Sequence, residues 1–308
     1  MNHPFHGSLV ALPTPFRGED LDIPALRRLV QAHARSGTSG IVACGTTGET
    51  ATLSREEQDA VAKTVLAHSG SMSVLVGVGT NSTRSTIQRA REVASLVVDG
   101  SRVDGLLAVT PYYNRPSRAG LDLHFDALAE AVDLPIVLYN VPARTGVDLA
   151  PQQARSLAAR HANVVAIKEA SGQPERIGAL CGDPNLAVLC GDDTLIGEFM
   201  AGGAVGAINV AGNVLPGPIA EWIDSARPTG DPDRAQALAT ELMPFIQAMF
   251  VETNPVPVKE ALALLGCCSS AVRAPLAPLT TRSREQVVAA LGLARETIAA
   301  SESSRVRS

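Results

Sequence analysis

The chain contains eight short apolar runs, and helix-length segments separate them. The runs are rich in Val, Leu, Ile and Ala, and their apolar residues are continuous rather than alternating with polar ones. Continuous runs of this length are typical of parallel strands that are buried on both faces. The expected strands are residues 8–16, 40–47, 73–80, 103–111, 134–142, 164–171, 186–193 and 204–212.

The segments between these runs carry the signals of amphipathic helices. Residues 23–37 place apolar side chains on one face, and Gly37 is expected to cap that helix at its C-terminus. Residues 54–70 open with Ser54, and Glu57 follows three residues later, which is the pattern of a capping box. The other expected helices are residues 82–98, 118–132, 151–161, 174–182, 193–203 and 216–226. This succession of strand–helix pairs predicts an α/β fold, a TIM (β/α)8 barrel.

The strand pattern stops after residue 226. A turn rich in proline and glycine follows at residues 226–232, and the remainder reads as helices only. The expected helices are residues 233–252, 257–266 and 283–300. We therefore expect two units, a (β/α)8 catalytic barrel at 1–226 and a small C-terminal helical bundle at 227–308.

Composition excludes several classes of protein. The 308 residues are 45% hydrophobic and 19% charged, which is ordinary for a globular chain. The net charge of −5 offers no basic surface for nucleic acid. No apolar run approaches the ~18 residues of a membrane helix, and the N-terminus lacks the pattern of a signal peptide. We expect a soluble, cytoplasmic protein with neither nucleic acid nor membrane as a partner.

The cysteines and histidines do not suggest a metal site. The five cysteines are odd in number and show no paired spacing, which indicates reduced thiols rather than disulfides. The six histidines are scattered, and none belongs to a metal-ligand motif such as His-Glu-x-x-His. We expect no metal and no disulfide.

Lysine is scarce, and one lysine has an unusual position. Of the 26 basic residues only Lys63, Lys168 and Lys259 are lysines. Lys168 follows the apolar residues 164–167 directly, without a turn residue. Lysine can lose its proton and act as an amine nucleophile, whereas arginine in effect cannot. The alternative is a structural lysine that extends to water or pairs with Glu169.

Other polar residues follow the expected strands at their carboxyl ends, where the active sites of barrel enzymes lie. They occur in "GTTGE" (45–49), "TPYYNRP" (110–116), "YNVPARTG" (139–146) and "GDD" (191–193). The only three tyrosines of the chain, Tyr112, Tyr113 and Tyr139, all lie in these segments. The alternative for the tyrosines is packing at the barrel mouth with their hydroxyls in water.

These residue types together suit one reaction. A lysine amine can attack a ketone to form a Schiff base, and a tyrosine hydroxyl can relay the protons that this requires. The free amine is favoured where the lysine is surrounded by apolar strand. The hydroxyls and amides of "GTTG" can hold a carboxylate, because glycine lets the backbone approach closely. The sequence therefore predicts a 2-oxo acid that is bound by its carboxylate and activated as an imine, then an enamine.

The segments "GTTGE", "TPYYNRPS", "YNVPARTG", "IKEASG" and "NPVPVK", in this order, resemble the dihydrodipicolinate synthase/N-acetylneuraminate lyase family over about residues 7 to 295. The resemblance implies a Schiff-base lyase, without a cofactor, that condenses pyruvate with L-aspartate 4-semialdehyde in lysine and diaminopimelate biosynthesis. It also implies a homotetramer, a dimer of dimers. "GTTGE" and the arginine of "ARTG" favour the synthases, because the neuraminate lyases typically read Gly-Ser-Thr-Gly-Glu and lack that arginine.

Three alternatives stay open. The first is a pyruvate-dependent aldolase of the same family, acting on a 2-keto sugar acid or on 4-hydroxy-2-oxoglutarate. The second is a non-catalytic barrel that senses 2-oxo acids, against which the intact lysine, tyrosine and threonine set argues. The third is pyridoxal phosphate on Lys168, which is disfavoured because no aspartate or arginine partner for a pyridine nitrogen is evident.

The resemblance also implies catalytic roles for four residues. Lys168 resembles the Schiff-base lysine, and Tyr139 the tyrosine that relays protons to it. Thr46 resembles the hydroxyl that links Tyr139 to Tyr113. Tyr113 resembles a residue that enters the site of the neighbouring subunit.

Four further residues resemble substrate contacts. Thr47 is similar to the residue that binds the pyruvate carboxylate. Arg144 is similar to the guanidinium that binds the carboxylate of the second substrate, a bidentate task suited to arginine. Gly191 and Ile208 match backbone positions that line the pocket.

A last expectation concerns feedback by L-lysine, which inhibits some members of the family. At positions that resemble their lysine site, Ser85 replaces a glutamate that would pair with an ammonium group. Arg55 replaces a histidine and adds a fixed positive charge near a cationic ligand. We therefore expect inhibition by lysine to be weak or absent.

Overall fold

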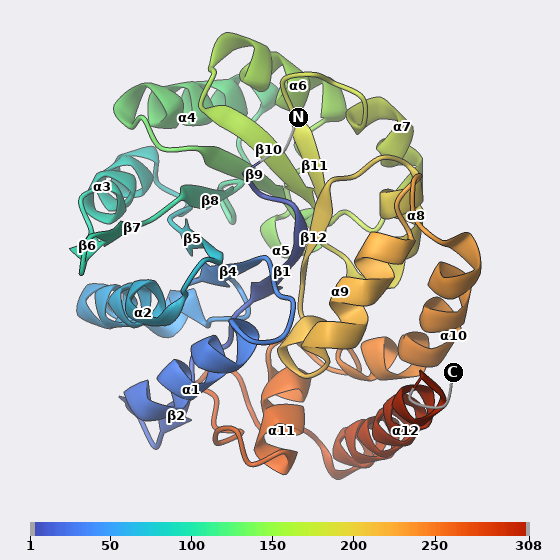
Figure 1. The fold of residues 1–308 in the computed structure, drawn as a ribbon. Coiled ribbons are helices and arrows are strands. Elements are labelled where there is room, and N and C mark those ends of the chain that lie inside the picture. The colour runs from blue at the N-terminus through green and yellow to red at the C-terminus, as the bar shows by residue number, and fades with distance from the viewer. Residues whose placement is uncertain (1–3, 306–308) are drawn as a thin grey trace.

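The computed structural model describes residues 4–305, with side chains described as far as Ala294. Its centre is a closed barrel of eight parallel strands, and helices surround it (Figure 1). The barrel strands are β1 (Gly7–Ala11), β4 (Gly40–Ala43), β5 (Ser73–Gly77), β8 (Gly105–Val109), β9 (Ile136–Asn140), β10 (Val164–Glu169), β11 (Ala187–Cys190) and β12 (Gly206–Asn209). Their order around the barrel is β1-β12-β11-β10-β9-β8-β5-β4, so β1 closes the ring between β12 and β4. The predicted TIM barrel and its eight strands are confirmed.

The outer layer consists of helices that alternate with the strands. They are α1 (Ile23–His33), α2 (Arg55–His68), α3 (Thr83–Ala94), α4 (Arg118–Ala131), α6 (Pro151–Arg160), α7 (Ile177–Leu180), α8 (Ile196–Ala201) and α9 (Pro216–Ser225). The helices predicted at 174–182 and 193–203 are shorter than expected, because each begins as a 3-10 turn, η2 (Pro174–Arg176) and η3 (Asp193–Leu195). A short helix that the sequence did not predict, α5 (Pro142–Thr145), follows β9.

The helix predicted at residues 82–98 ends earlier than expected. It stops at Ala94, and β6 (Val97–Val98) instead pairs antiparallel with β7 (Ser101–Arg102). Asp99 and Gly100 form the turn with positive φ angles of 49° and 84°. An Asp-Gly dipeptide favours such a two-residue hairpin, and valine favours the extended backbone beside it. The end of the predicted helix was therefore wrong.

Two predicted helix caps have different outcomes. Gly37 does not cap α1, which ends at His33 with Ala34 as its C-cap. Gly37 lies beyond the helix in a left-handed conformation, φ 80°, and serves the turn into β4. The capping box of α2 is confirmed, because the Ser54 side chain accepts from the Glu57 amide and the Glu57 side chain accepts from the Ser54 amide.

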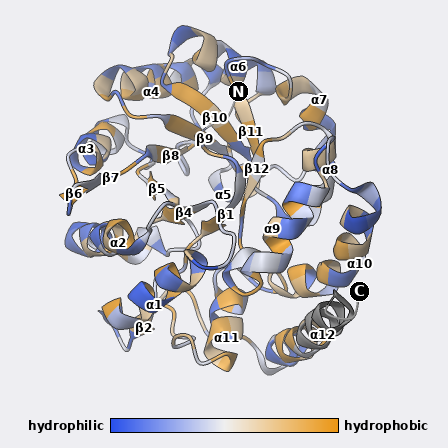
Figure 2. Ribbon diagram, viewed as in Figure 1, coloured by the Kyte–Doolittle hydropathy of each residue, from blue (hydrophilic) through white to orange (hydrophobic). Residues whose placement is uncertain are grey.

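The core has two parts. Side chains inside the barrel form one cluster, which includes Leu9, Val42, Val137, Tyr139 and Ile208. A larger cluster fills the space between the strands and the surrounding helices. Figure 2 shows the strands as largely hydrophobic, while the helices combine hydrophobic and hydrophilic residues. Strands buried on both faces explain the continuous apolar runs of the sequence.

In the described part of the C-terminal region the regular elements are all helices, as predicted. They are α10 (Pro232–Ala248), α11 (Val256–Leu264) and α12 (Thr281–Arg305). Helix α10 packs against α9 of the barrel layer and against α12, and α11 packs against α12 (Figure 1). Among the described residues no helix has the length and apolar character needed to cross a membrane.

Candidate active site at the carboxyl ends of the strands

Lys168 and Tyr139 lie on neighbouring strands and face one another. Strands β9 and β10 are parallel, and their register pairs Lys168 with Tyr139 directly. Lys168 Nζ lies 4.3 Å from the centroid of the Tyr139 ring. Both residues are only 6% exposed. Two rigid strands therefore hold an amine and a phenol together near the mouth of the barrel.

Gly191 makes room for the lysine side chain. It follows β11, the strand on the other side of β10 from β9. A Cβ atom at this position would lie 2.9 Å from both Cγ and Cε of Lys168, and 2.8 Å from Cβ of Ala170. Such contacts are shorter than the 3.4–4 Å of ordinary packing. The absence of a side chain at Gly191 thus helps to decide where the Lys168 chain lies.

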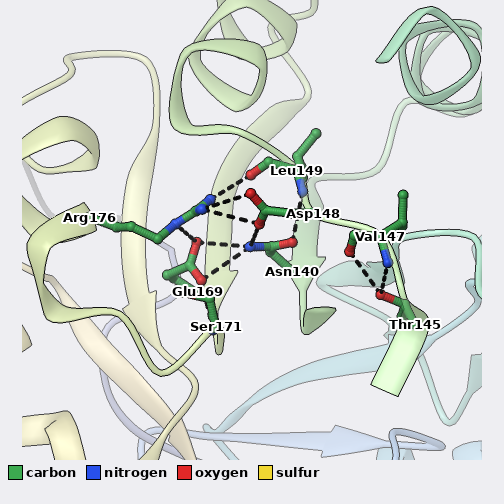
Figure 3. A network of polar contacts seen from close by, with 8 residues as sticks. All are labelled: Asn140, Thr145, Val147, Asp148, Leu149, Glu169, Ser171 and Arg176. Carbon is green, nitrogen blue, oxygen red and sulfur yellow. Dashed lines mark hydrogen bonds and ion pairs between the residues drawn. The ribbon is translucent and has the colours of Figure 1, made fainter. Parts of the chain in front are cut away.

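Glu169 does not form an ion pair with Lys168. Successive side chains of a strand point to opposite faces, so Lys168 points into the barrel and Glu169 points toward the helices. Glu169 Oε2 accepts a hydrogen bond from Arg176 Nε at 3.1 Å (Figure 3). The sequence alternative, in which Glu169 is the partner of Lys168, was wrong.

The same outward network ties strands β9 and β10 together. Asn140 Nδ2 donates to both carboxylate oxygens of Glu169 at 3.2 Å, across the β9–β10 register (Figure 3). Arg176 also donates to the carboxylate of Asp148 and to the carbonyl of Leu149. Asn140 directly follows Tyr139, and Glu169 directly follows Lys168. The other members of the network are hydrogen-bonded to one of these two residues. The network therefore fixes the strand ends from which the two inward side chains project.

The turn of residues 45–49 places two threonines at the mouth. Thr46 is half-buried and lines a cavity of about 500 Å³. Thr47 is buried, and its hydroxyl oxygen accepts a hydrogen bond from Asn254 Nδ2 at 2.9 Å. Because the Asn254 side-chain amide donates this hydrogen bond, the Thr47 hydroxyl proton remains available for donation to another group. A carboxylate is a suitable acceptor for it.

Arg144 lies at the rim of the same cavity. It belongs to α5, directly after β9, and its side chain is exposed. Arg144 Nη2 donates to the backbone carbonyl of Asn254 at 3.3 Å. The remaining donors of the guanidinium can bind an anion. Asn254 also lines the cavity, and so do Tyr112 and Thr145.

The other predicted site residues are spread more widely. Ile208 is buried inside the barrel in the same apolar cluster as Tyr139. Tyr113 is 88% exposed and has a positive φ of 74°, which is uncommon for a bulky residue. In the part of the chain that the structure describes, the hydroxyls of Tyr139 and Thr46 are not hydrogen-bonded to one another. The proton relay through Thr46 and Tyr113 therefore stays a prediction.

Asn254 is the main residue that sequence reasoning missed. It belongs to the segment "NPVPVK", which contributed to the family resemblance without a role for its asparagine. It joins the C-terminal region to Thr47 and to Arg144, the two proposed carboxylate contacts. The signal that could have found it is a polar residue directly before a Pro-Val-Pro segment, far from any expected strand end.

Buried titratable groups near the strand ends have shifted pKa values. Burial raises the pKa of Asp193 to about 6, although its carboxylate accepts from the amides of Val210 and Ala211. Burial also raises the pKa of the Cys44 thiol to about 12, which keeps this cysteine protonated and unreactive at neutral pH. All five cysteines are free thiols. Within the described residues, no three His, Cys, Asp or Glu side chains form a group that could hold a metal ion.

Comparison with known proteins agrees with this geometry. The model of the dihydrodipicolinate synthetase family matches residues 4–294. The 4-hydroxy-tetrahydrodipicolinate synthase of Pelobacter propionicus is 46% identical, over 93% of this chain and 98% of its own. The solved structure of the synthase of the same name from Methylacidiphilum fumariolicum SolV matches with a TM-score of 0.91 and 38% identity, over 97% of this chain and 98% of that one.

A second solved structure is the chloride-inhibited dihydrodipicolinate synthase from Acinetobacter baumannii, complexed with pyruvate. It matches with a TM-score of 0.89 and 40% identity, and it covers 94% of this chain and 98% of its own. The family match and these similarities extend over nearly the whole sequence, barrel and C-terminal region alike. This chain belongs to the dihydrodipicolinate synthetase family.

Proposed function

We propose that this chain is a Schiff-base-forming lyase that condenses pyruvate with L-aspartate 4-semialdehyde to 4-hydroxy-tetrahydrodipicolinate. The reaction is a step of lysine and diaminopimelate biosynthesis. The observation that carries the proposal is the Lys168 amine, buried near the barrel mouth and held 4.3 Å from the Tyr139 ring centroid. The names of the relatives support the choice of substrates.

The first half of the reaction activates pyruvate. The unprotonated Lys168 amine adds to the ketone carbon, and the resulting carbinolamine loses water to form an imine. The Tyr139 phenol supplies a proton to the departing hydroxyl group. Loss of a proton from the pyruvate methyl group then gives the enamine.

The second half joins the substrates and frees the enzyme. The enamine carbon adds to the aldehyde carbon of the semialdehyde, and the aldehyde oxygen takes up a proton and becomes the 4-hydroxyl group. The amino group of the semialdehyde then adds to the imine carbon and displaces Lys168. The product is a cyclic imine, and the balance is two substrates to one product and one water.

Two contacts orient the substrates in this scheme. Thr47 donates its free hydroxyl proton to the pyruvate carboxylate, while Asn254 holds the hydroxyl oxygen. Arg144 binds the carboxylate of the semialdehyde at the rim of the cavity by charge-assisted hydrogen bonds. Gly191 and Ile208 line the pyruvate pocket. Oriented carboxylates hold the reacting carbons at a productive distance from the amine.

Tyr113 suggests that the active enzyme is an oligomer. A tyrosine that is 88% exposed on a strained loop has no contact with the cavity of its own chain. In a homotetramer arranged as a dimer of dimers, Tyr113 enters the site of its neighbour and completes the relay from Thr46. The enzyme works in the cytoplasm, where its metabolite substrates are found.

The test is reductive trapping. Wild-type protein incubated with pyruvate and borohydride should gain a stable adduct on Lys168, identified by mass spectrometry of peptides. Lys168→Ala should lose the adduct and remain folded, while Lys63→Ala, at an exposed lysine of α2, should keep it. An adduct on Lys168→Ala would show that another residue is the nucleophile.

A second assay separates the proposed reaction from an aldolase of the same family. Purified enzyme should consume pyruvate only when aspartate semialdehyde is present, and it should not release pyruvate from 4-hydroxy-2-oxoglutarate or from 2-keto sugar acids. Release from either compound at a comparable rate would favour the aldolase.

A further inference from the structure

A second lysine, Lys259, is buried although it is not part of the reaction. It lies on α11 in the C-terminal region and is 0% exposed. Its Nζ donates to Glu49 Oε1 at 2.6 Å and to the carbonyl of Thr14 at 2.9 Å. The same atom lies 4.2 Å from the centroid of the Phe16 ring. A compact ammonium with three donors suits this arrangement better than the planar guanidinium used almost everywhere else in the chain.

Glu49 is equally constrained. Its second carboxylate oxygen accepts the backbone amide of Arg273 at 3.0 Å. Its backbone has a φ of 54°, in the left-handed region that few residues other than glycine adopt. Both carboxylate oxygens thus bind the C-terminal region, while the backbone of Glu49 ends the turn that carries Thr46 and Thr47. Residues in such conformations persist where surrounding contacts hold them.

The turn has little structure of its own. Between Gly45 and Glu49, the backbone bonds within the turn are Gly48 N to Gly45 O and Glu49 N to Thr46 O, both 3.1 Å. Outside contacts supply the rest. Thr14 Oγ1 donates to the Gly48 carbonyl at 2.7 Å, and Asn254 donates to Thr47. Lys259 therefore binds two of the segments, at Thr14 and at Glu49, that together fix this turn.

General stability is a poor explanation for the pair. Moving two charges out of water carries a desolvation penalty that their attraction often does not exceed, so an apolar replacement of similar volume is commonly as stable. Burial lowers the pKa of Lys259, while its hydrogen bond to Glu49 acts in the opposite direction. What the pair adds, and an apolar contact does not, is a fixed direction for the Glu49 side chain and thus for the turn.

We propose that Lys259 and Glu49 form a positioning pair that orients the 45–49 turn, so that Thr46 and Thr47 face the pyruvate bound at Lys168. The inference rests on the roles proposed above for these two threonines. It makes pyruvate binding and turnover depend on a lysine of the C-terminal region that touches neither substrate.

The experiment compares two double variants. Lys259→Met/Glu49→Gln removes the buried pair, keeps similar volumes and leaves an amide oxygen to accept from Arg273. Glu260→Gln/Arg284→Met removes an exposed pair, 2.7 Å, that involves the next residue of the same helix. The readouts are the melting temperature, the turnover number, and the pyruvate concentration that gives half-maximal borohydride trapping, all measured well below the melting temperature.

The buried-pair variant should need about tenfold more pyruvate for half-maximal trapping and should turn over about tenfold more slowly, as expected for a displaced contact. The exposed-pair variant should stay within about twofold of wild type in both, since it leaves the turn untouched. A folded buried-pair variant with wild-type constants would overturn the inference, whatever its melting temperature.

If that variant does not fold, Glu49→Gln alone decides. It keeps the shape of the side chain but has one acceptor oxygen for the two donors of Lys259 and Arg273, so pyruvate half-saturation should still rise several-fold. An unchanged value would reject the positioning role. Absence of a pyruvate adduct in wild-type protein would instead refute the proposed function, which separates the two failures.

Discussion

Replacing Gly191 by alanine should slow the enzyme without unfolding it. The added Cβ would lie 2.9 Å from Cγ and Cε of Lys168, where ordinary contacts begin at 3.4 Å. The lysine chain must therefore move by about 0.5 Å or more. The new Cβ atom cannot easily move away from the lysine, because it would also lie 2.8 Å from Cβ of Ala170. Overpacking of this kind typically costs about 1–3 kcal/mol of stability.

The effect on catalysis follows from the displacement. A misplacement of about 1 Å can lower a rate by about 10²-fold, so about 0.5 Å corresponds to roughly tenfold if the logarithm of the loss scales with distance. We expect the turnover number of Gly191→Ala to fall by about tenfold or more, and the rate of borohydride trapping with pyruvate to fall with it. Both rates report on the position of the same Nζ atom.

The control is Gly178→Ala in α7, where an added Cβ would meet no atom within 4 Å. This variant should keep wild-type turnover. The measurements are turnover in a coupled assay with both substrates, trapping rate by mass spectrometry, and melting temperature. Gly191→Ala with turnover within about twofold of wild type would refute the reasoning, because it would mean that Lys168 reacts equally well from a displaced position.

The remaining predictions concern stability, pH and ligands. Glu169→Gln should lower the free energy of unfolding by about 1–3 kcal/mol in urea titrations, because Arg176 Nε loses its charged acceptor while Asp148 still pairs with Nη1. Asp122→Asn, at an exposed pair, should cost less than about 1 kcal/mol. Burial lowers the pKa of His33 to about 4, so the neutral imidazole contributes about 3 kcal/mol to the free energy of unfolding above pH ~6.5. This contribution is lost as the pH falls toward 4. His33→Gln should therefore flatten the plot of unfolding free energy against pH in this range, and an unchanged slope would contradict the prediction. Arg144→Ala should raise the Michaelis constant for aspartate semialdehyde far more than that for pyruvate, and the reverse pattern would reject its role. L-lysine at 1 mM, pH 8, should leave more than half of the initial rate, whereas half-inhibition below 1 mM would show a functional lysine site.

The sequence was most informative where a pattern of residues had a single physical explanation. Continuous apolar runs are required of strands covered on both faces, so all eight barrel strands could be found from them. The rule that barrel sites lie at the carboxyl ends of strands then located Lys168 and Tyr139, which the structure brings together in register.

The errors have local causes. Val97 and Val98, the first strand of a hairpin, were read as the end of the helix predicted at 82–98, because these two valines also continue an apolar helical face. Glu169 was considered as a partner of Lys168 because it is next in sequence, although adjacent residues of a strand point to opposite faces. That alternation was available from the sequence and would have predicted an outward partner for Glu169, though not the identity of Arg176.

Pairings between distant residues could not be predicted from one sequence. Glu49 and Lys259 are 210 positions apart, and their contact depends on how α11 packs against the barrel. Asn254 and Thr47 are 207 positions apart. Nothing in the local pattern of either segment specifies its partner, since hydrophobic periodicity reports which face of an element is buried and not what covers it.

These distant contacts change the meaning of the proposed boundary at residue 226. The pattern of strands and helices divides the chain there, but the polar contacts of the barrel mouth cross it. Asn254 binds Thr47 and Arg144, and Lys259 pairs with Glu49, so a barrel without the C-terminal region would lose these polar partners. The strands therefore hold the proposed nucleophile and its phenol, whereas the proposed carboxylate-binding turn also needs contacts from helix α11 and from the segments on either side of it. Substitutions of Asn254 or Lys259 should consequently affect pyruvate binding, although both residues lie far from Lys168 along the chain.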